Sequence, residues 1–145
     1  MAATSGTAGT KTAGAKPTKV LKKSKKKSIQ AFPIGNVCIH ATYNNTIVSF
    51  TDPAGNVLAW SSAGQCGFKG PKKATPYAAG IIVKTAAEKL TPFGMKDVNV
   101  FVTGIGMGRE GAVRALHANG LNVLVIKDAT PIAHGGCRQR RPRRV

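Results

Sequence analysis

Positive charge is concentrated at the two ends of this chain, and this distribution limits which part of it can fold. The first 30 residues hold eight lysines and the last eight residues hold five arginines, and neither segment contains an acidic residue. Segments of this composition repel themselves and have too few large apolar side chains to bury a core. We therefore expect a disordered lysine-rich arm over residues 1–30, a folded body over residues 31–130 and an arginine-rich tail over residues 131–145.

The composition of the whole chain narrows the possible classes of function. Its 145 residues suffice for one domain, and Lys and Arg number 22 against 5 for Asp and Glu, a formal net charge of +17. A charge of this size favours a polyanionic partner, and nucleic acid is the leading interpretation. So few carboxylates disfavour a hydrolytic enzyme or a two-metal centre.

Membrane and secretory functions are also disfavoured. No apolar run approaches the roughly 20 residues of a membrane span, and the lysine-rich arm has neither a bulky apolar face nor a lipidation motif. The chain has 3 cysteines and no apolar leader, so we expect an intracellular protein with reduced thiols. A mitochondrial presequence is a weaker interpretation of the arm, because such peptides favour arginine and an amphipathic helix.

The first half of the body predicts an antiparallel meander. Alternating apolar residues indicate three strands joined by short turns, near residues 37–42, 46–51 and 57–61. Phe50 and Trp60 lie in these runs and are interpreted as core residues. An open basic loop follows over residues 63–74.

The second half predicts helices and parallel strands. Thr75 followed by Pro76 marks the start of a helix that ends at Pro92 and Gly94. Gly80 inside this helix suggests close packing or a replaced ancestral residue. A strand near 98–102, a helix over 109–118 with Val113 and Leu116 inward, and a nearly continuous apolar strand over 121–126 form a βαβ unit. The expected fold class is α/β, a single domain with a mixed sheet of about five strands and two main helices.

A glycine motif precedes the second predicted helix. Gly106, Gly108 and Gly111 spell GxGxxG after a strand, and Asp128 lies at the end of the next strand, as in a dinucleotide-binding enzyme. Arg109 crowds this turn, and too little chain follows Asp128 for a doubly wound domain. The alternative interpretation is that the glycine amides and Arg109 approach a phosphate of a nucleic-acid backbone.

Cysteine and histidine residues allow a weak zinc hypothesis. Cys38 and His40 share a strand face, and His134 and Cys137 have the spacing of a ligand pair. Without a CxxC pair, buried Cys as a small apolar residue and His as a phosphate donor are better interpretations. A Cys–His nucleophile would need a carboxylate as a third group to orient the histidine, and none is evident. We expect no catalytic residue, metal or cofactor. Tyr43 and Phe68 lie in predicted turns and are candidates for stacking on bases.

Several motifs in sequence order resemble the universal small-subunit ribosomal protein S11 family in its bacterial form. They begin with Ile39, Ala41, the run 43–46 (YNNT) and Asp52, and they continue with 55–64 (GNVLAWSSAG), 67–70 (GFKG), 75–79 (TPYAA), 108–110 (GRE), 114–116 (RAL), Asp128, 130–131 (TP), His134 and 136–138 (GCR). The resemblance covers about residues 33–145. The chain departs from the family pattern at Gly80, Ile105 and Gly135, where Gln, Pro and Asn are common.

The resemblance implies a platform protein of the small subunit that performs no catalysis. It would bind ribosomal RNA of the central domain and the neighbouring 3′ region, close to the messenger RNA exit and beside other platform proteins, in cytoplasmic or organellar ribosomes, with no small-molecule substrate. The RNA-binding residues that we expect from charge, turn position and family likeness are Lys22, Lys23, Lys25, Lys26, Lys27, Asn44, Asn45, Lys69, Lys72, Lys73, Gly106, Gly108, Arg109, Arg114, His134, Arg138, Arg140, Arg141, Arg143 and Arg144. The alternatives are a nucleotide-binding enzyme that uses residues 106–111 and a generic DNA-compacting protein.

Overall fold

The computed structural model describes residues 30–138, 140 and 141. Nearly all of the lysine-rich arm lies outside these residues, and so do Arg143 and Arg144 of the tail. The predictions for Lys22, Lys23, Lys25, Lys26 and Lys27 also concern residues outside the described part of the chain.

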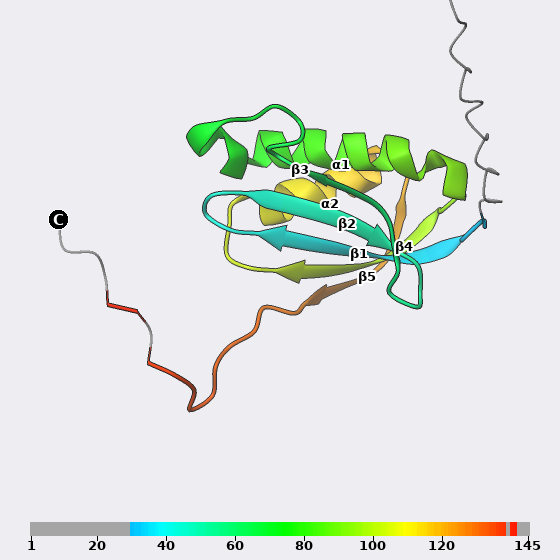
Figure 1. Ribbon diagram of the computed structural model, residues 1–145. Coiled ribbons are helices and arrows are strands. Elements are labelled where there is room, and N and C mark those ends of the chain that lie inside the picture. Colours follow the sequence, from blue (N-terminus) through cyan, green and yellow to red (C-terminus); the bar gives the residue numbers. More distant parts are fainter. Residues whose placement is uncertain (1–29, 139, 142–145) are drawn as a thin grey trace, which may run out of the picture.

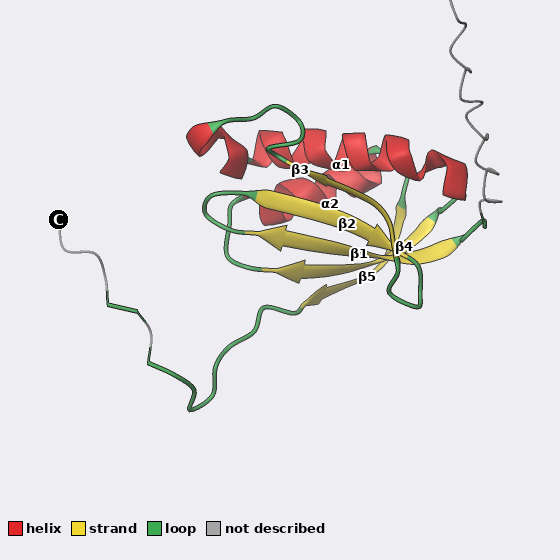
Figure 2. Ribbon diagram, in the orientation of Figure 1, coloured by secondary structure: helices red, strands yellow, loops and turns green. Residues whose placement is uncertain are grey.

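The body is built on a five-stranded mixed sheet (Figures 1 and 2). The strands are β1 (Ile34–Ala41), β2 (Thr46–Thr51), β3 (Val57–Ser62), β4 (Asp97–Thr103) and β5 (Asn122–Asp128), in the order β3-β2-β1-β4-β5. β2 pairs antiparallel with both β1 and β3, and β4 pairs parallel with both β1 and β5. The predicted meander followed by a βαβ unit is confirmed.

Two helices, α1 (Pro76–Leu90) and α2 (Gly108–Ala118), cover one face of the sheet (Figure 2). α1 packs over β2 and β3, and α2 packs over β1 and β5 and against α1. Two short 3₁₀ helices flank α1, namely η1 (Gly70–Ala74) within the predicted basic loop and η2 (Thr91–Phe93). Among the described residues, no helix covers the opposite face of the sheet.

Local chemistry explains the boundaries of α1. The Thr75 hydroxyl accepts the backbone N–H of Ala78 at 3.2 Å, and Pro76 occupies the first turn, where a missing N–H costs nothing. Gly94 follows η2 with a φ of 65°, a conformation that favours glycine. The core between helices and sheet is apolar and fully enclosed: Val37, Ile39, Val48, Phe50, Ala79, Ile82, Val83, Ala86, Val98, Val100, Ala112 and Leu116 are all buried.

The prediction that Trp60 is a core residue is wrong. Trp60 is 51% exposed, because it points to the face of the sheet that the helices leave open. The apolar strand β5 is also largely exposed, with Ile126 at 59%, because β5 ends the sheet and α2, which lies over both β1 and β5, covers it only in part. Phe68, a candidate for stacking on bases, is half-buried and meets the Tyr77 ring edge-on at 6.3 Å.

Replacing Gly80 by Ala is expected to stabilise the protein. A Cβ at Gly80 would contact nothing within 4 Å, so close packing does not require glycine there. Alanine lowers the backbone entropy of the unfolded chain, and we expect an increase of about 0.5–1 kcal/mol in the free energy of unfolding. Urea denaturation of the full chain measures this difference.

Gly111 in α2 provides the matched control. A Cβ there would lie 2.9 Å from the Pro76 carbonyl oxygen, where the two helices approach each other. The same substitution should therefore bring no gain or lower stability, since the clash opposes the entropic benefit. If Gly80→Ala fails to stabilise, helix propensity does not limit this segment of α1.

Candidate nucleic-acid interface

Four segments lie toward the same end of the molecule, at the left of Figure 1. They are the turn at residues 42–45 after β1, the η1 helix, the loop at residues 104–107 after β4, and the chain that leaves β5 from Ala129 onward. β1, β4 and β5 are parallel, so their carboxyl ends share one edge of the sheet. We call this region the loop end.

The glycine loop packs on the turn that follows β1. The Gly106 N–H donates to the Ala41 carbonyl at 3.0 Å, and a Cβ at Gly106 would lie 2.3 Å from the Thr42 carbonyl oxygen. A Cβ at Gly108 would lie 2.3 Å from the Thr46 hydroxyl oxygen. These two glycines are buried against the chain itself. Packing on this turn therefore explains why both residues are glycine. The sequence had suggested a different reason, namely that glycine lets the backbone amides come close to a phosphate.

Apolar side chains between the glycines are the exposed part of this loop. Ile105 is 63% exposed and Met107 is 77% exposed. Sequence reasoning concentrated on the glycines and missed both residues. The signal that could have found them is the alternation of large apolar residues with glycines that are too small to cover them.

Arg109 is bonded to groups of its own chain. Its guanidinium donates to the Asp128 carboxylate, to the Gly104 carbonyl and, at 3.2 Å, to the Thr130 hydroxyl oxygen. The Thr130 hydroxyl in turn donates to Asp128 at 2.6 Å. This cluster, which we call the clasp, joins the loop after β4 to the first residues of the tail.

Lowering the pH should weaken the clasp, and a comparison with Asp128→Asn should assign this loss of stability to Asp128. Hydrogen bonds from the Thr130 hydroxyl and backbone, followed by the Arg109 guanidinium, lower the pKa of Asp128 from 3.8 to about 2. A depressed folded-state pKa means that the unfolded chain binds more protons, so this carboxylate stabilises the fold above about pH 4 and loses that effect as pH falls toward 2. We expect the difference in urea midpoint between the wild type and Asp128→Asn to shrink over that range.

Two further measurements control this prediction. Asn56 lowers the pKa of Asp52, but that residue is present in both proteins and its effect cancels in the difference. Thr130→Val removes the largest cause of the shift, so it should raise the Asp128 pKa measured by NMR. A midpoint difference that is constant with pH would contradict the role of the clasp.

Free positive charge at the loop end comes from Lys72 and Lys73 of η1 and from Lys69, the residue before it, which together we call the η1 lysines. Lys69 and Lys72 are exposed and Lys73 is half-buried. The described residues hold two ion pairs, Arg109–Asp128 and Arg114–Glu110, so none of these three lysines pairs with a carboxylate in that part of the chain.

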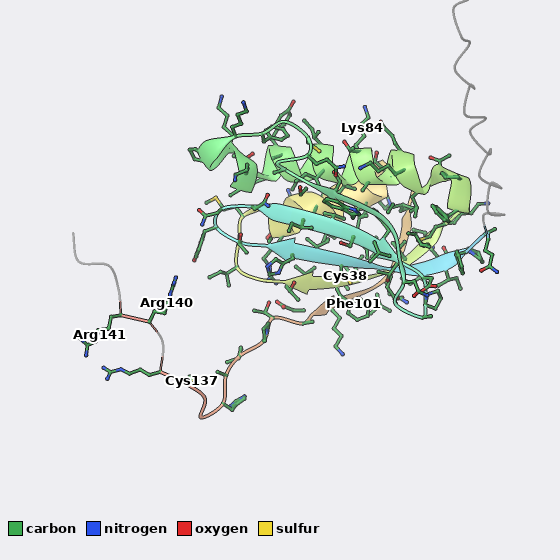
Figure 3. All side chains as sticks on the ribbon, viewed as in Figure 1. Cys38, Lys84, Phe101, Cys137, Arg140 and Arg141 are labelled. Atoms are coloured by element: carbon green, nitrogen blue, oxygen red, sulfur yellow. The ribbon has the colours of Figure 1, made fainter. Side chains whose placement is uncertain are left out.

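The other predicted residues lie near this region or beyond it. Asn44 is exposed in the turn after β1, whereas the side-chain oxygen of Asn45 accepts the Thr46 N–H at 3.0 Å. Arg114 lies one helical turn after Glu110 on the exposed surface of α2. The tail leaves the loop end with its side chains exposed, and Figure 3 shows Arg140 and Arg141 well away from the sheet. The described tail residues from the predicted set are His134, Arg138, Arg140 and Arg141.

Comparison with known proteins places the chain in a family. The family model described as ribosomal protein S11 matches residues 35–144. The chain belongs to the ribosomal protein S11 family. Proteins named small ribosomal subunit protein uS11 from Desulfovibrio desulfuricans and Lawsonia intracellularis are each 50% identical to it over 131 residues, which are 90% of this chain and 99% of each relative. The protein of the same name from Caldicellulosiruptor saccharolyticus is 50% identical over 127 residues, 88% of this chain and 95% of the relative.

Membership of the S11 family gives this chain a structural, non-enzymatic role in the ribosome. The alternative of a dinucleotide-binding enzyme is therefore wrong. The structure gives the physical reason for the misleading motif: Gly106 and Gly108 pack on the turn after β1, and Asp128, the residue that would bind a ribose, is bonded to Arg109. The family resemblance inferred from the sequence is confirmed.

The structure also bears on metals and membranes. Among the described residues, no three His, Cys, Asp or Glu side chains come together as a metal site would require, so the two Cys–His pairs do not converge there. In the same part of this S11 family member, no helix has the length and apolar character needed to cross a bilayer.

Proposed function

We propose that this chain binds small-subunit ribosomal RNA through the loop end and its arginine-rich tail. The observation that carries the proposal is the position of the η1 lysines. They have no carboxylate partner in the described part of the chain, and they lie at the end of the body from which the tail departs. Flexible cationic segments gain affinity by releasing counterions from phosphates. The folded body sets the orientation in which these segments meet the RNA.

The proposed contact residues combine the body with both ends of the chain. Lys69, Lys72, Lys73 and Asn44 offer exposed or half-buried polar groups, and Arg109 contributes by holding the start of the tail. The remaining contacts are Asn45, Gly106, Gly108, Arg114, His134, Arg138, Arg140 and Arg141, together with Lys22, Lys23, Lys25, Lys26, Lys27, Arg143 and Arg144 outside the described residues. For the buried glycines the proposed contribution is the shape of the loop.

The proposed location follows from the family. The RNA would be the central domain and the neighbouring 3′ region, on the platform close to the messenger RNA exit, in a cytoplasmic ribosome of the bacterial type. The named relatives come from bacteria, which supports this assignment.

Neighbouring platform proteins are the second proposed partner class. Leu124, Val125 and Ile126 expose apolar side chains on β5, whose outer edge pairs with no other strand among the described residues. Such an edge strand is normally covered in a stable assembly. A protein neighbour that covers β5 would remove this apolar surface from water.

Competition between two polyanions tests the proposed function. The full chain, bound to a labelled central-domain fragment of small-subunit RNA, is challenged with unlabelled fragment or with duplex DNA of equal phosphate number. We expect the RNA to compete far more effectively, because folded RNA offers shape and unpaired loops that a duplex lacks. Equal competition would instead support the DNA-compacting alternative.

The salt dependence of the same complex gives a second test. If about six phosphates are neutralised, the affinity should fall on the order of a thousandfold between 50 and 200 mM salt. An RNA complex that is insensitive to salt would contradict the proposed electrostatic mechanism.

A further inference from the structure

The exposed position of Trp60 is not explained by the loop end or by the tail. Trp60 is the only tryptophan of the chain, and half of its side chain is open to solvent in the middle of β3. Its neighbours Ala59 and Ser61 point into the core and are buried. Because successive side chains of a strand alternate, Trp60 lies on the face of the sheet that no helix covers.

The strand register places Trp60 in a row that crosses the whole sheet. Trp60 pairs with Ser49, Ser49 with Cys38, Cys38 with Phe101, and Phe101 with Lys127. Three strand spacings separate the two aromatic residues, about 14 Å in total. Figure 3 shows Cys38 and Phe101 on the side of the sheet opposite Lys84 of α1.

The shape of this row suits flat ligands. Ser49 and Cys38 have short side chains, and they separate Trp60, which is exposed, from Phe101, which is half-buried. The next row holds Ile47 and His40, and His40 is fixed by a hydrogen bond between its Nδ1 and the Thr103 hydroxyl at 3.1 Å. We call these two rows the open face.

The charge of the open face disfavours a cationic ligand. Its two rows contain Lys127 and no carboxylate. Asp128 follows Lys127 directly, but its side chain lies on the helical side of the sheet and is paired with Arg109. Asp97, four residues before Phe101 at the start of β4, accepts a hydrogen bond from Asn122 at 3.0 Å. Aromatic rings without nearby acids, in a chain of net charge +17, match an anionic polymer that carries flat faces of its own.

We infer that the open face binds unpaired nucleotides of RNA by stacking bases on Trp60 and Phe101. Unpaired bases present free faces for stacking, whereas duplex bases do not. Lys127 lies at the end of the same row and can neutralise a phosphate of the bound strand. This inference rests on the proposed RNA-binding function and adds a second contact surface to it, apart from the loop end.

Trp60 itself reports on the inference. The full chain is titrated with a short oligouridylate, with duplex RNA of equal phosphate number and with inorganic polyphosphate, while tryptophan fluorescence is recorded. We expect the oligouridylate to quench the fluorescence strongly and the other two polyanions to leave it nearly unchanged. Unchanged fluorescence with saturating oligouridylate, or equal quenching by all three, would overturn the inference.

Two variants separate stacking from charge. Phe101→Leu keeps Trp60 as the reporter, and Trp60→Leu is followed by the anisotropy of labelled oligouridylate. Each should weaken binding roughly tenfold, as expected for the loss of one base stack. Tyr77→Leu, the matched control, removes an exposed ring from the helical side and should leave the affinity within about twofold. Equal losses in all three variants would contradict a specific open face.

Failure of the inference can be told apart from failure of the proposed function. If Trp60→Leu and Phe101→Leu melt like the wild type and bind oligouridylate equally well, stacking is wrong even when the central-domain fragment still binds. If the wild type does not bind the central-domain fragment, the proposed function fails as well. Quenching of Trp60 by a ribosomal protein and not by oligouridylate would assign the open face to a protein partner and overturn the inference.

Discussion

Replacing the five tail arginines by glutamine is expected to lower the affinity for small-subunit RNA on the order of a thousandfold at about 0.1 M salt. The substituted residues are Arg138, Arg140, Arg141, Arg143 and Arg144. Each phosphate contact that is lost removes nearly one released counterion, so the slope of log affinity against log salt should also become shallower. Filter binding with the central-domain fragment over a series of salt concentrations measures both effects.

Stability should not follow affinity in this experiment. The described tail residues from Arg138 onward are exposed and belong to no strand or helix, so the melting temperature of the body should stay nearly unchanged. The matched control replaces the same five arginines by lysine, which keeps the charge and should retain most of the affinity. If the lysine variant binds as weakly as the glutamine variant, bidentate recognition by arginine matters more than charge. A large drop in melting temperature would show that the tail belongs to the fold.

Gly104→Ala is expected to destabilise the fold by about 3–5 kcal/mol. Gly104 has a φ of +92°, which L side chains rarely adopt, and a Cβ there would lie 2.1 Å from the Ala41 carbonyl oxygen. The backbone strain and the clash act at the same position, and the neighbour is a rigid strand end that cannot move aside cheaply. Urea denaturation of the full chain measures the loss.

Two other glycines separate the causes. Gly67 has a φ of +85° and open space around its Cβ position, so Gly67→Ala should cost only about 1–2 kcal/mol, from strain alone. Gly106 has ordinary φ but a Cβ position 2.3 Å from the Thr42 carbonyl oxygen, so Gly106→Ala tests the clash alone. If Gly104→Ala costs no more than Gly67→Ala, the loop after β4 does not press on the turn after β1 as the structure indicates.

Local sequence signals predicted the elements of this fold and their order. The cap at Thr75, the proline at the next position and the spacing of Ala79, Ile82 and Val83 act within a few residues, and all were confirmed. Burial of Trp60 was predicted wrongly because it depends on which face of the sheet the helices cover. The covered face is determined by how α1 and α2 pack on the sheet and on each other, and the periodicity of a strand carries no information about this packing.

The candidate interface was predictable in composition but not in its internal bonds. Charge and turn chemistry pointed to the η1 lysines and to the glycine loop. The sequence did not show that Arg109 forms an ion pair with Asp128, 19 residues away. It also did not show that Gly106 packs against Thr42, which lies more than sixty positions earlier. Such pairings arise only when parallel strands bring their carboxyl ends together, so they require the tertiary structure.

The clasp also limits how far the tail arginines can reach from the body. With Thr130 held to the body, the eight residue steps to Arg138 can extend at most about 28 Å, so the first tail arginine searches a bounded volume around its anchor. Once the η1 lysines bind an RNA strand, phosphates inside that volume are at a high effective concentration for the tail arginines. Several weak contacts then combine into a higher overall affinity. Replacing Asp128 would remove contacts that hold Thr130 to the body. The tail arginines would then range over a larger volume, although none of them has been removed.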